Sequence, residues 1–232
     1  KTFSWVAHIP PPPLKLGGLG AFTGDFSLLL TSTDGQLIER EYGSVVHWNY
    51  NTFQWFNHGA PADTFLTTVL ETSRSKTYSF FALSSHGLLF EGNLVTRNWT
   101  AHGCPVGERL SQGPAVAIRD EQNEVTSIFL RTEFGNLVER WYNRALNRWE
   151  WLPHGHPPSA VLLGSPGGLP RSKSIFVTTA GGKVAERRFD PDLGEWTWIS
   201  HGRPRGGRMT CDRPVAVNGS SIFFLLDDRR LA

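Results

Sequence analysis

One short phrase recurs along this chain and limits what the chain can fold into. The phrase is Trp-x-x-His-Gly-x-Pro, and its full copies begin at Trp55, Trp99, Trp151 and Trp198. A degenerate copy, from Trp5 through His8 to Pro11, opens the sequence. The His residues of successive copies are 50, 44, 52 and 47 residues apart. A period of this length is typical of one supersecondary unit repeated around a ring or along a rod.

A second anchor precedes each full copy and predicts the strands of the unit. It has the form Gly-x-Leu-x-Glu and reads Gly35/Leu37/Glu39, Gly87/Leu89/Glu91, Gly135/Leu137/Glu139 and, with Val184 for Leu, Gly182/Val184/Glu186. Eight residues before each of these Gly, an apolar run begins at a Ser: Ser27, Ser79, Ser127 and Ser174. Fainter apolar runs come earlier, at 67–70, 115–117 and 160–163. Short apolar runs bounded by turn residues indicate buried strands, so we expect four strands in each unit.

The two ends of the chain complement each other. The last unit has a faint run at 214–217, an apolar run at 221–226 and the start of a third strand at 229–232, but no Trp-x-x-His strand. Residues 1–8 supply that strand. The sequence therefore predicts an all-β fold: one five-bladed β-propeller over 1–232, with four-stranded antiparallel blades and a ring closed by the N-terminal strand pairing into the last blade. The expected blades are about 11–61, 62–105, 106–157, 158–204, and 205–232 with 1–10.

The net charge, the cysteines and the glycosylation motifs indicate where the protein is located and what it can bind. The formal net charge of +2 gives no general attraction to nucleic acid, and no apolar run approaches the roughly 20 residues of a membrane span. Asn98 and Asn218 are glycosylation acceptors expected in or beside turns, which favours a secreted or lumenal location. Since the chain begins at Lys1, we expect it to be a piece of a longer protein. Cys104 and Cys211 belong to blades that are not neighbours, so we predict two free thiols.

The repeated residues have two competing interpretations. The interval from Glu to Trp is even in every unit, so a symmetric hairpin loop would place both on one face of the sheet, beside the His. In the first interpretation these side chains pack blade against blade. In the second, the grooves between blades bind sugars, which stack on Trp and hydrogen-bond to Glu and His. The candidate ligand-binding residues are Glu39, Trp55, His58, Glu91, Trp99, His102, Glu139, Trp151, His154, Glu186, Trp198 and His201.

The repeat resembles that of the β-propeller lectins, above all the fungal fucose-specific lectins, whose blades carry a Gly-x-Ile/Leu-x-Glu strand followed by a Trp-bearing strand. A five-bladed ring of this length is also similar to the tachylectin-like lectins. The resemblance implies that the repeated Glu accept sugar hydroxyls and the repeated Trp are stacking platforms. This chain departs from the fucose-binding pattern at one position of each blade: the fucose-specific lectins carry an Arg on the inner apolar strand, and this chain carries a Ser there. The matching positions here are Ser27, Ser79, Ser127, Ser174 and Ser221.

An Arg cluster in blade five and the loop that enters it breaks the symmetry and supports a different function. The candidate patch for an anionic partner is Arg203, Arg205, Arg208 and Arg213. Its fork-shaped guanidinium groups suit an acidic protein or polysaccharide. The alternative to a glycan or glycoprotein partner is therefore a protein-interaction module that uses one face.

An enzyme is the third and least favoured alternative. A glycosidase would need paired acids near the axis, and only Asp25, Asp63 and Asp212 fall at suitable places. No Ser-His-Asp spacing, Cys-x-x-Cys pair or phosphate-binding Gly loop occurs. We therefore expect a non-catalytic binding module with no cofactor and no metal.

Overall fold

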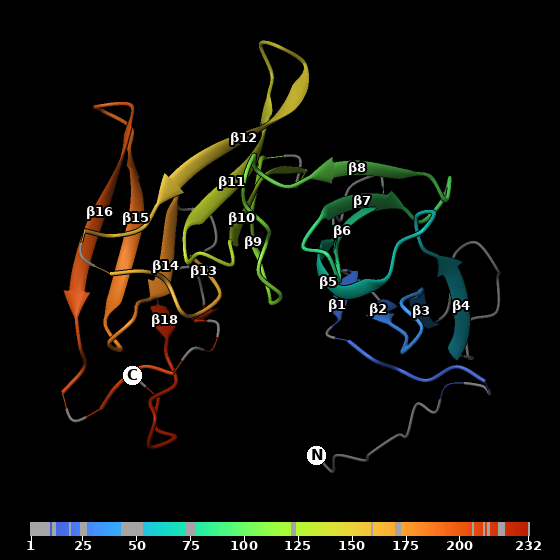
Figure 1. Ribbon diagram of the computed structural model, residues 1–232, viewed down its shortest axis with the longest axis horizontal. Coiled ribbons are helices and arrows are strands. Elements are labelled where there is room, and N and C mark those ends of the chain that lie inside the picture. The colour runs from blue at the N-terminus through green and yellow to red at the C-terminus, as the bar shows by residue number, and fades with distance from the viewer. Residues whose placement is uncertain are drawn as a thin grey trace.

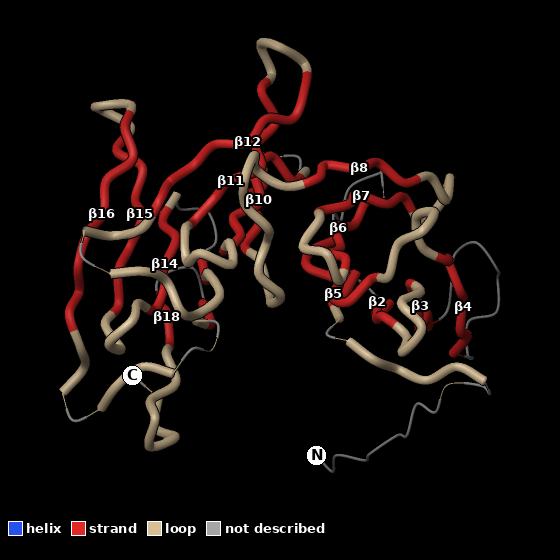
Figure 2. The backbone as a smooth tube through the Cα atoms, in the orientation of Figure 1, coloured by secondary structure: helices blue, strands red, loops and turns tan. Residues whose placement is uncertain are grey.

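The computed structural model describes residues 10, 13–18, 20–23, 27–42, 53–72, 78–121, 124–158, 160–169, 173–205, 207–210, 212, 214–217 and 221–231. All regular secondary structure in this part of the chain is β-strand, as Figure 2 shows. No helix long and apolar enough to cross a membrane is found there. The strands form four sheets of four antiparallel strands and one sheet of two.

Each sheet is built from strands consecutive in sequence. Sheet 1 consists of β1 (Ala21–Thr23), β2 (Ser27–Thr31), β3 (Leu37–Tyr42) and β4 (Phe53–Gly59). Sheet 2 consists of β5 (Leu66–Thr72), β6 (Ser79–Ser84), β7 (Leu89–Asn93) and β8 (Trp99–Gly103). Sheet 3 consists of β9 (Val116–Arg119), β10 (Val125–Arg131), β11 (Leu137–Asn143) and β12 (Arg148–Gly155). Sheet 4 consists of β13 (Gly167–Gly168), β14 (Ser174–Thr178), β15 (Val184–Asp190) and β16 (Glu195–Gly202). Sheet 5 consists of β17 (Val215–Val217) and β18 (Ser221–Phe223).

The sheets stand side by side around a common centre. The first strand of each sheet contacts the first strand of the next, from β1 through β5, β9 and β13 to β17. The fourth strands, β4, β8, β12 and β16, lie at the periphery (Figure 1). This is the arrangement of β-propeller blades. The predicted all-β propeller of four-stranded antiparallel sheets is confirmed for sheets 1 to 4, while five blades and a closed ring stay predictions because residues 1–9 lie outside the described part.

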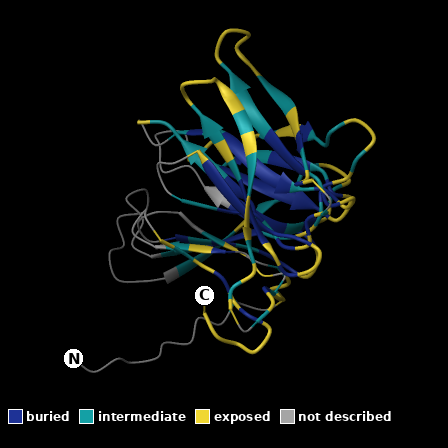
Figure 3. Ribbon diagram, turned by 90° about the vertical axis from the view of Figure 1, so that its left-hand side faces the viewer, coloured by how far each residue is buried: buried dark blue, intermediate teal, exposed yellow. Residues whose placement is uncertain are grey.

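The hydrophobic core lies between the sheets. Four clusters of buried side chains each join two consecutive sheets: Leu29 with Phe80, Phe81 with Ile128, Phe129 with Ile175, and Phe176 with Phe224. Figure 3 shows the buried residues gathered along the middle strands and the exposed ones at the turns. Sheets 2, 3 and 4 pack between two neighbours, so their second strands, β6, β10 and β14, are buried over most of their length and read as continuous apolar runs.

One strand prediction is wrong. The run 160–163 was expected to be the first strand of its unit, but that strand is β13, two Gly long. A Cβ on Gly167 would lie 2.5 Å from the carbonyl oxygen of Pro214, and one on Gly168 2.6 Å from a methyl of Val116. The inner strands meet there, so only glycine fits, and glycine carries no apolar signal.

The run around Leu162 instead belongs to a backbone clamp that sequence reasoning missed. In each clamp, an amide at or just before the start of a sheet donates to the carbonyl of a turn Gly in the preceding sheet. The bonds are Leu66 to Gly35 (3.0 Å), Leu110 to Gly87 (3.1 Å), Leu162 to Gly135 (2.9 Å) and Met209 to Gly182 (3.5 Å). Each of these apolar residues stands eight positions after the repeated His, a regularity visible in the sequence.

The turn whose carbonyl accepts the clamp hydrogen bond is also present in sheet 5. The four turn Gly have φ between 68° and 78°, and Arg229 occupies the matching position with φ 67°. Its amide donates to Leu226 (2.9 Å), just as that of Gly135 donates to Thr132 (3.0 Å). A fifth turn of the same form is therefore present, even though its residue is not glycine.

Candidate functional site

The repeated Glu and His form an ion pair or hydrogen bond within each of the first four sheets. The Nε2–Oε2 distances are 2.8 Å for His58–Glu39, 3.1 Å for His102–Glu91, 2.9 Å for His154–Glu139 and 2.8 Å for His201–Glu186. The pair in sheet 3 is deeply buried, with 1% of the His154 side chain and 7% of the Glu139 side chain exposed. Ser127 donates a further hydrogen bond to Glu139 (2.5 Å). Buried charges of this kind need such partners to remain buried.

The next sheet along the chain completes the surroundings of the His. Arg140 Nε lies 3.3 Å from His102 Nδ1, and Trp151 Nε1 donates to the backbone carbonyl of His102 (3.2 Å). One sheet further on, the same contacts recur at the same distances: Arg187 with His154 Nδ1, and Trp198 with the His154 carbonyl. Arginine only donates, so the ring accepts at Nδ1 and carries its proton at Nε2, facing the carboxylate.

Aromatic stacking strengthens the same junctions. The guanidinium groups of Arg140 and Arg187 lie over the rings of Trp151 and Trp198, at 5.1 and 5.3 Å. Burial lowers the pKa of both arginines below the usual value. The second aromatic of each motif packs edge-on against the preceding His: Trp149 on His102 at 5.3 Å, and Trp196 on His154 at 4.9 Å. The junctions between sheets 2 and 3 and between sheets 3 and 4 thus join Glu and His of one sheet to Arg and two Trp of the next, and at the second of them Ser127 also contacts the Glu.

The prediction that Glu and Trp of one hairpin share a face is wrong. Residues directly opposite are Arg140 and Trp151, while Glu139 faces Leu152. The same offset holds in sheets 1, 2 and 4. The turn between Asn143 and Arg148 has an even number of residues, which shifts the pairing by one relative to a symmetric odd loop. Hence the Glu of each sheet faces the following sheet, and the Trp faces the preceding one.

The junction between sheets 1 and 2 departs from this pattern. The Arg position of sheet 2 is Gly92, and His58 Nδ1 is buried without a hydrogen-bond partner among the described residues. Opposite Gly92 stands Phe80, where the other sheets have Leu28, Ile128 and Ile175. A Cβ on Gly92 would lie 2.1 Å from the ring of Phe80, which in turn packs edge-on against Trp99 at 5.1 Å. The Phe ring therefore fills the space that Arg occupies elsewhere.

We expect Gly92→Ala to destabilise the protein by about 1–3 kcal/mol, because the added Cβ overpacks the Phe80 ring. The double variant Phe80→Ile/Gly92→Arg restores the residues of sheet 3 and gives His58 a donor. It should therefore be more stable than the sum of its single variants by about 1–3 kcal/mol. Urea unfolding measures both values. Additive single effects would show that the two positions are not coupled.

Not every repeated His is enclosed. The His201 side chain is 41% exposed and stacks on Phe176 at 5.9 Å. Its partner Glu186 is 1% exposed and accepts Arg188 Nε at 2.7 Å. Burial raises the pKa of Glu186, but hydrogen bonds from Arg188, Ser174 and His201 outweigh it and leave the pKa below its usual value. The Trp strand that would cover His201 is predicted at 1–8, outside the described residues.

The remaining sequence candidates occupy the turns. Arg203, Arg205 and Arg208 are exposed. Arg213 and Asn218 lie outside the described residues. Asn98 is exposed in the turn between β7 and β8, so its predicted hairpin position is confirmed.

The candidate acids and cysteines gather into no further site. Asp63 and Asp212 are exposed, and Asp25 is outside the described part. Cys104 has a free, half-buried thiol, whereas Cys211 is not described. Among the described residues, no group of three or more His, Cys, Asp or Glu is placed to hold a metal ion.

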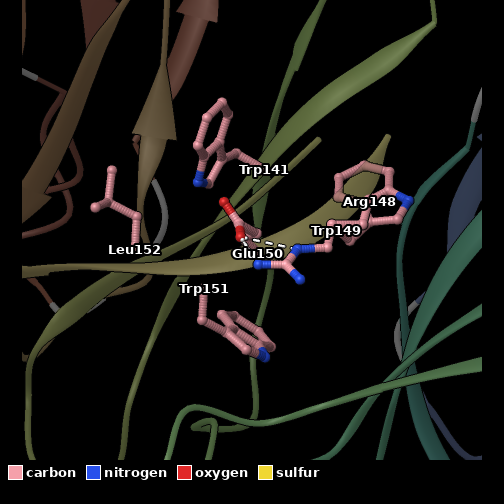
Figure 4. Close-up of a pocket in the computed structure, with 6 residues that line it drawn as sticks. All are labelled: Trp141, Arg148, Trp149, Glu150, Trp151 and Leu152. Carbon is pink, nitrogen blue, oxygen red and sulfur yellow. Dashed lines mark hydrogen bonds and ion pairs between the residues drawn. The ribbon is translucent and has the colours of Figure 1, made fainter. Parts of the chain in front are cut away.

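A pocket of about 590 Å³ opens at the outer edge of sheet 3, and sequence reasoning missed it (Figure 4). Its lining is Trp141, Arg148, Trp149, Glu150, Trp151 and Leu152. Trp149 and Trp151 belong to the junction with sheet 2, whereas Trp141 lies directly opposite Glu150 on the other face of the sheet. The signal in the sequence is the break in the repeat: sheets 1, 2 and 4 have Glu41, Asn93 and Arg188 where sheet 3 has Trp141.

The chain matches no protein-family model and no curated protein. It is similar to the solved structure of YCF48 from Cyanidioschyzon merolae over 98% of this chain and 71% of that one, with a TM-score of 0.62 and 17% identity. It is also similar to the β-propeller domain of Cps50 (Swd1) from Myceliophteria thermophila, over 88% and 63%, with a TM-score of 0.59 and 7% identity. A third match is the extracellular domain of BT4673 from B. thetaiotaomicron, over 90% and 25%, with a TM-score of 0.53 and 13% identity.

These similarities agree with the sheet arrangement, and the fold is a β-propeller. The chain spans less than two thirds of the length of the second and third matches. At identities of 7–17% the similarity concerns the fold alone.

Proposed function

We propose that this chain is a non-catalytic propeller module that docks a protein partner through one end of the molecule. The observation that carries the proposal is a continuous strip of exposed apolar and cationic residues across two sheet junctions. We call it the docking strip, and it consists of Phe134, Val161, Leu163, Arg203, Arg205 and Arg208. The repeated Trp, Glu and His favour this proposal over the groove lectin, because they already contact one another.

The apolar half of the strip lies where sheet 4 is clamped to sheet 3. Phe134 is 66% exposed and precedes the clamped Gly135. Val161 and Leu163, 41% and 43% exposed, flank the residue that donates to that Gly. Exposed apolar side chains gathered at one place are typical of interaction surfaces.

The cationic half continues directly from the apolar half. The Ala180 amide donates to the Val161 carbonyl (2.8 Å), which places the following turn beside the apolar half. The Arg203 guanidinium lies over that turn, 3.5 Å from where a Cβ on Gly181 would stand, and the Arg208 Cβ packs on Gly182. Asp228 is paired with Arg230 (2.6 Å), and the described residues provide no salt bridge for Arg203, Arg205 or Arg208. The chemistry therefore suits an acidic segment that carries apolar side chains.

Capture of the partner from the native source, followed by lysine cross-linking, tests the proposal. Lys183 lies in the turn beside Arg203, whereas Lys173 precedes β14 at the opposite end of sheet 4, and both are exposed. We expect cross-links at Lys183 and not at Lys173. The double variant Arg203→Glu/Arg208→Glu should lose the partner, because the charge at the strip is reversed.

The matched control is Arg97→Glu/Arg144→Glu, which makes the same charge change in the turns at the other end. This control should retain the partner. Capture that survives Arg203→Glu/Arg208→Glu, or cross-links that concentrate at Lys173, would overturn the proposed surface.

The proposal includes a closed ring of five units in an extracytoplasmic setting. Two observations support the ring: the fifth acceptor turn at Arg229, and Leu16, which stands eight residues after His8 in the position of the clamp donors. Pairing of Leu16 with Arg229 would be the fifth clamp; the described residues do not form this bond, so it belongs to the proposal. The exposed acceptor Asn98 supports the secreted or lumenal location, and its glycosylation in a secreting cell would be detected by mass spectrometry.

A further inference from the structure

Trp141 differs from the other described tryptophans in its contacts. Each of the other six, Trp55, Trp99, Trp149, Trp151, Trp196 and Trp198, makes a hydrogen bond, a ring contact or a cation–π contact. Trp141 makes no such contact with the described residues, and it remains partly exposed in the pocket at the edge of sheet 3. A half-buried indole that lines a pocket and makes no hydrogen bond, ring contact or cation–π contact with the described residues is a natural stacking surface for a ligand.

The polar side chains beside it are held in place. Asn143 donates to Glu150 Oε2 (2.7 Å), and Arg148 donates to Glu150 Oε1 through Nε (3.0 Å) and Nη2 (2.7 Å). The dashed lines in Figure 4 mark the contact with Arg148. The hydrogen bonds from Asn143 and Arg148 keep the pKa of Glu150 below its usual value, so the carboxylate is ionised and oriented.

The charge balance selects the ligand class. Glu150 and Arg148 offset each other, so the site attracts neither an anion nor a cation strongly. Glu150 keeps acceptor capacity and Arg148, 66% exposed, keeps unused N–H donors. A neutral ligand with an apolar face and several hydroxyl groups would use the indole, the acceptor and the donors together.

We propose that the pocket formed by Trp141, Arg148, Glu150 and Leu152 is a single binding site for a neutral pyranose sugar, which stacks on the Trp141 indole and hydrogen-bonds to the Glu150–Arg148 pair. The site is independent of the docking strip, because it lies at the edge strand of sheet 3 and shares no residue with it. It also differs from the repeated grooves, since sheets 1, 2 and 4 lack this combination of residues.

The test uses the whole chain with methyl β-D-glucopyranoside, methyl β-D-galactopyranoside and an array of neutral and acidic oligosaccharides. The indole N–H signals of the tryptophans are followed by NMR during titration, and the Trp141 signal is identified from Trp141→Phe. We expect one equivalent of neutral sugar to bind and to shift the Trp141 signal but not that of Trp198. Trp141→Ala should weaken binding at least about tenfold, and Glu150→Ala should weaken it too.

Urea unfolding of Trp141→Ala shows whether the variant is still folded. We expect its unfolding midpoint to stay close to that of the wild type. Phe134→Ala, at the other end of the molecule, and Arg203→Glu/Arg208→Glu should both keep full sugar binding. The latter control separates this site from the proposed docking function. The proposal is overturned by silence toward every neutral sugar, by binding that survives Trp141→Ala, by several equivalents per chain, or by binding of charged glycans alone.

Discussion

Replacing Glu139 with alanine is expected to destabilise the protein by about 2–5 kcal/mol, because two buried donors lose their acceptor and each unsatisfied donor costs about 1–3 kcal/mol. Glu139 accepts a hydrogen bond from Ser127 and pairs with His154, whose side chain is 1% exposed. The variant leaves both groups buried without their acceptor. Urea unfolding monitored by tryptophan fluorescence measures the change in free energy.

Glu133→Ala is the matched control. Glu133 lies exposed in the turn before the same strand, and its backbone amide keeps its bond to Arg109 in the variant. We expect this change to stay within about 0.5 kcal/mol. If Glu139→Ala also stayed within that range, the repeated Glu–His pair would not hold the sheets together.

Trp198→Ala is expected to cost about 3 kcal/mol, because the indole joins sheet 4 to sheet 3. Its N–H donates to the His154 carbonyl, and Arg187 stacks on its ring. Trp198→Phe keeps the stacking surface but loses the hydrogen bond, so it should cost about 1 kcal/mol.

The same variants separate the two interpretations of the repeat. A groove that binds sugar through Trp198 would lose binding in Trp198→Ala while stability stayed near that of the wild type. The junction described above predicts the reverse: a large loss of stability in Trp198→Ala and an intermediate loss in Trp198→Phe. Urea unfolding of the two variants side by side decides between them.

Most of the fold was predictable because every unit has the same pattern of buried strands and tight turns, and this pattern recurs in the sequence. Buried second strands are continuous apolar runs, and turns that need a positive φ carry glycine, so both leave a plain sequence signal. The face of Trp151 was mispredicted, since the pairing depends on whether the turn holds an odd or even number of residues. The glycine strand β13 was missed because close backbone approach removes the apolar side chains that mark a strand.

The candidate sites were harder to predict for the opposite reason. Residues that repeat, such as His154, proved to lie in contacts between sheets. Trp141 breaks the repeat, and it remains half-exposed without a hydrogen bond, ring contact or cation–π contact among the described residues. The Arg cluster was noticed from the sequence because it breaks the symmetry of charge, whereas its apolar neighbours Phe134 and Val161 are distant from it in sequence and meet it only in three dimensions.

Hydrogen exchange at the backbone amide of Leu16 tests most directly whether one set of contacts repeats around the whole molecule. A closed ring of five units predicts that Leu16 donates to the Arg229 carbonyl, as Leu66, Leu110 and Leu162 donate to their turn Gly. Its amide should then exchange slowly, at a rate close to theirs. Exchange of Leu16 as fast as that of an exposed turn, with the other three protected, would show that the ring is open at this point and would contradict the five-unit account.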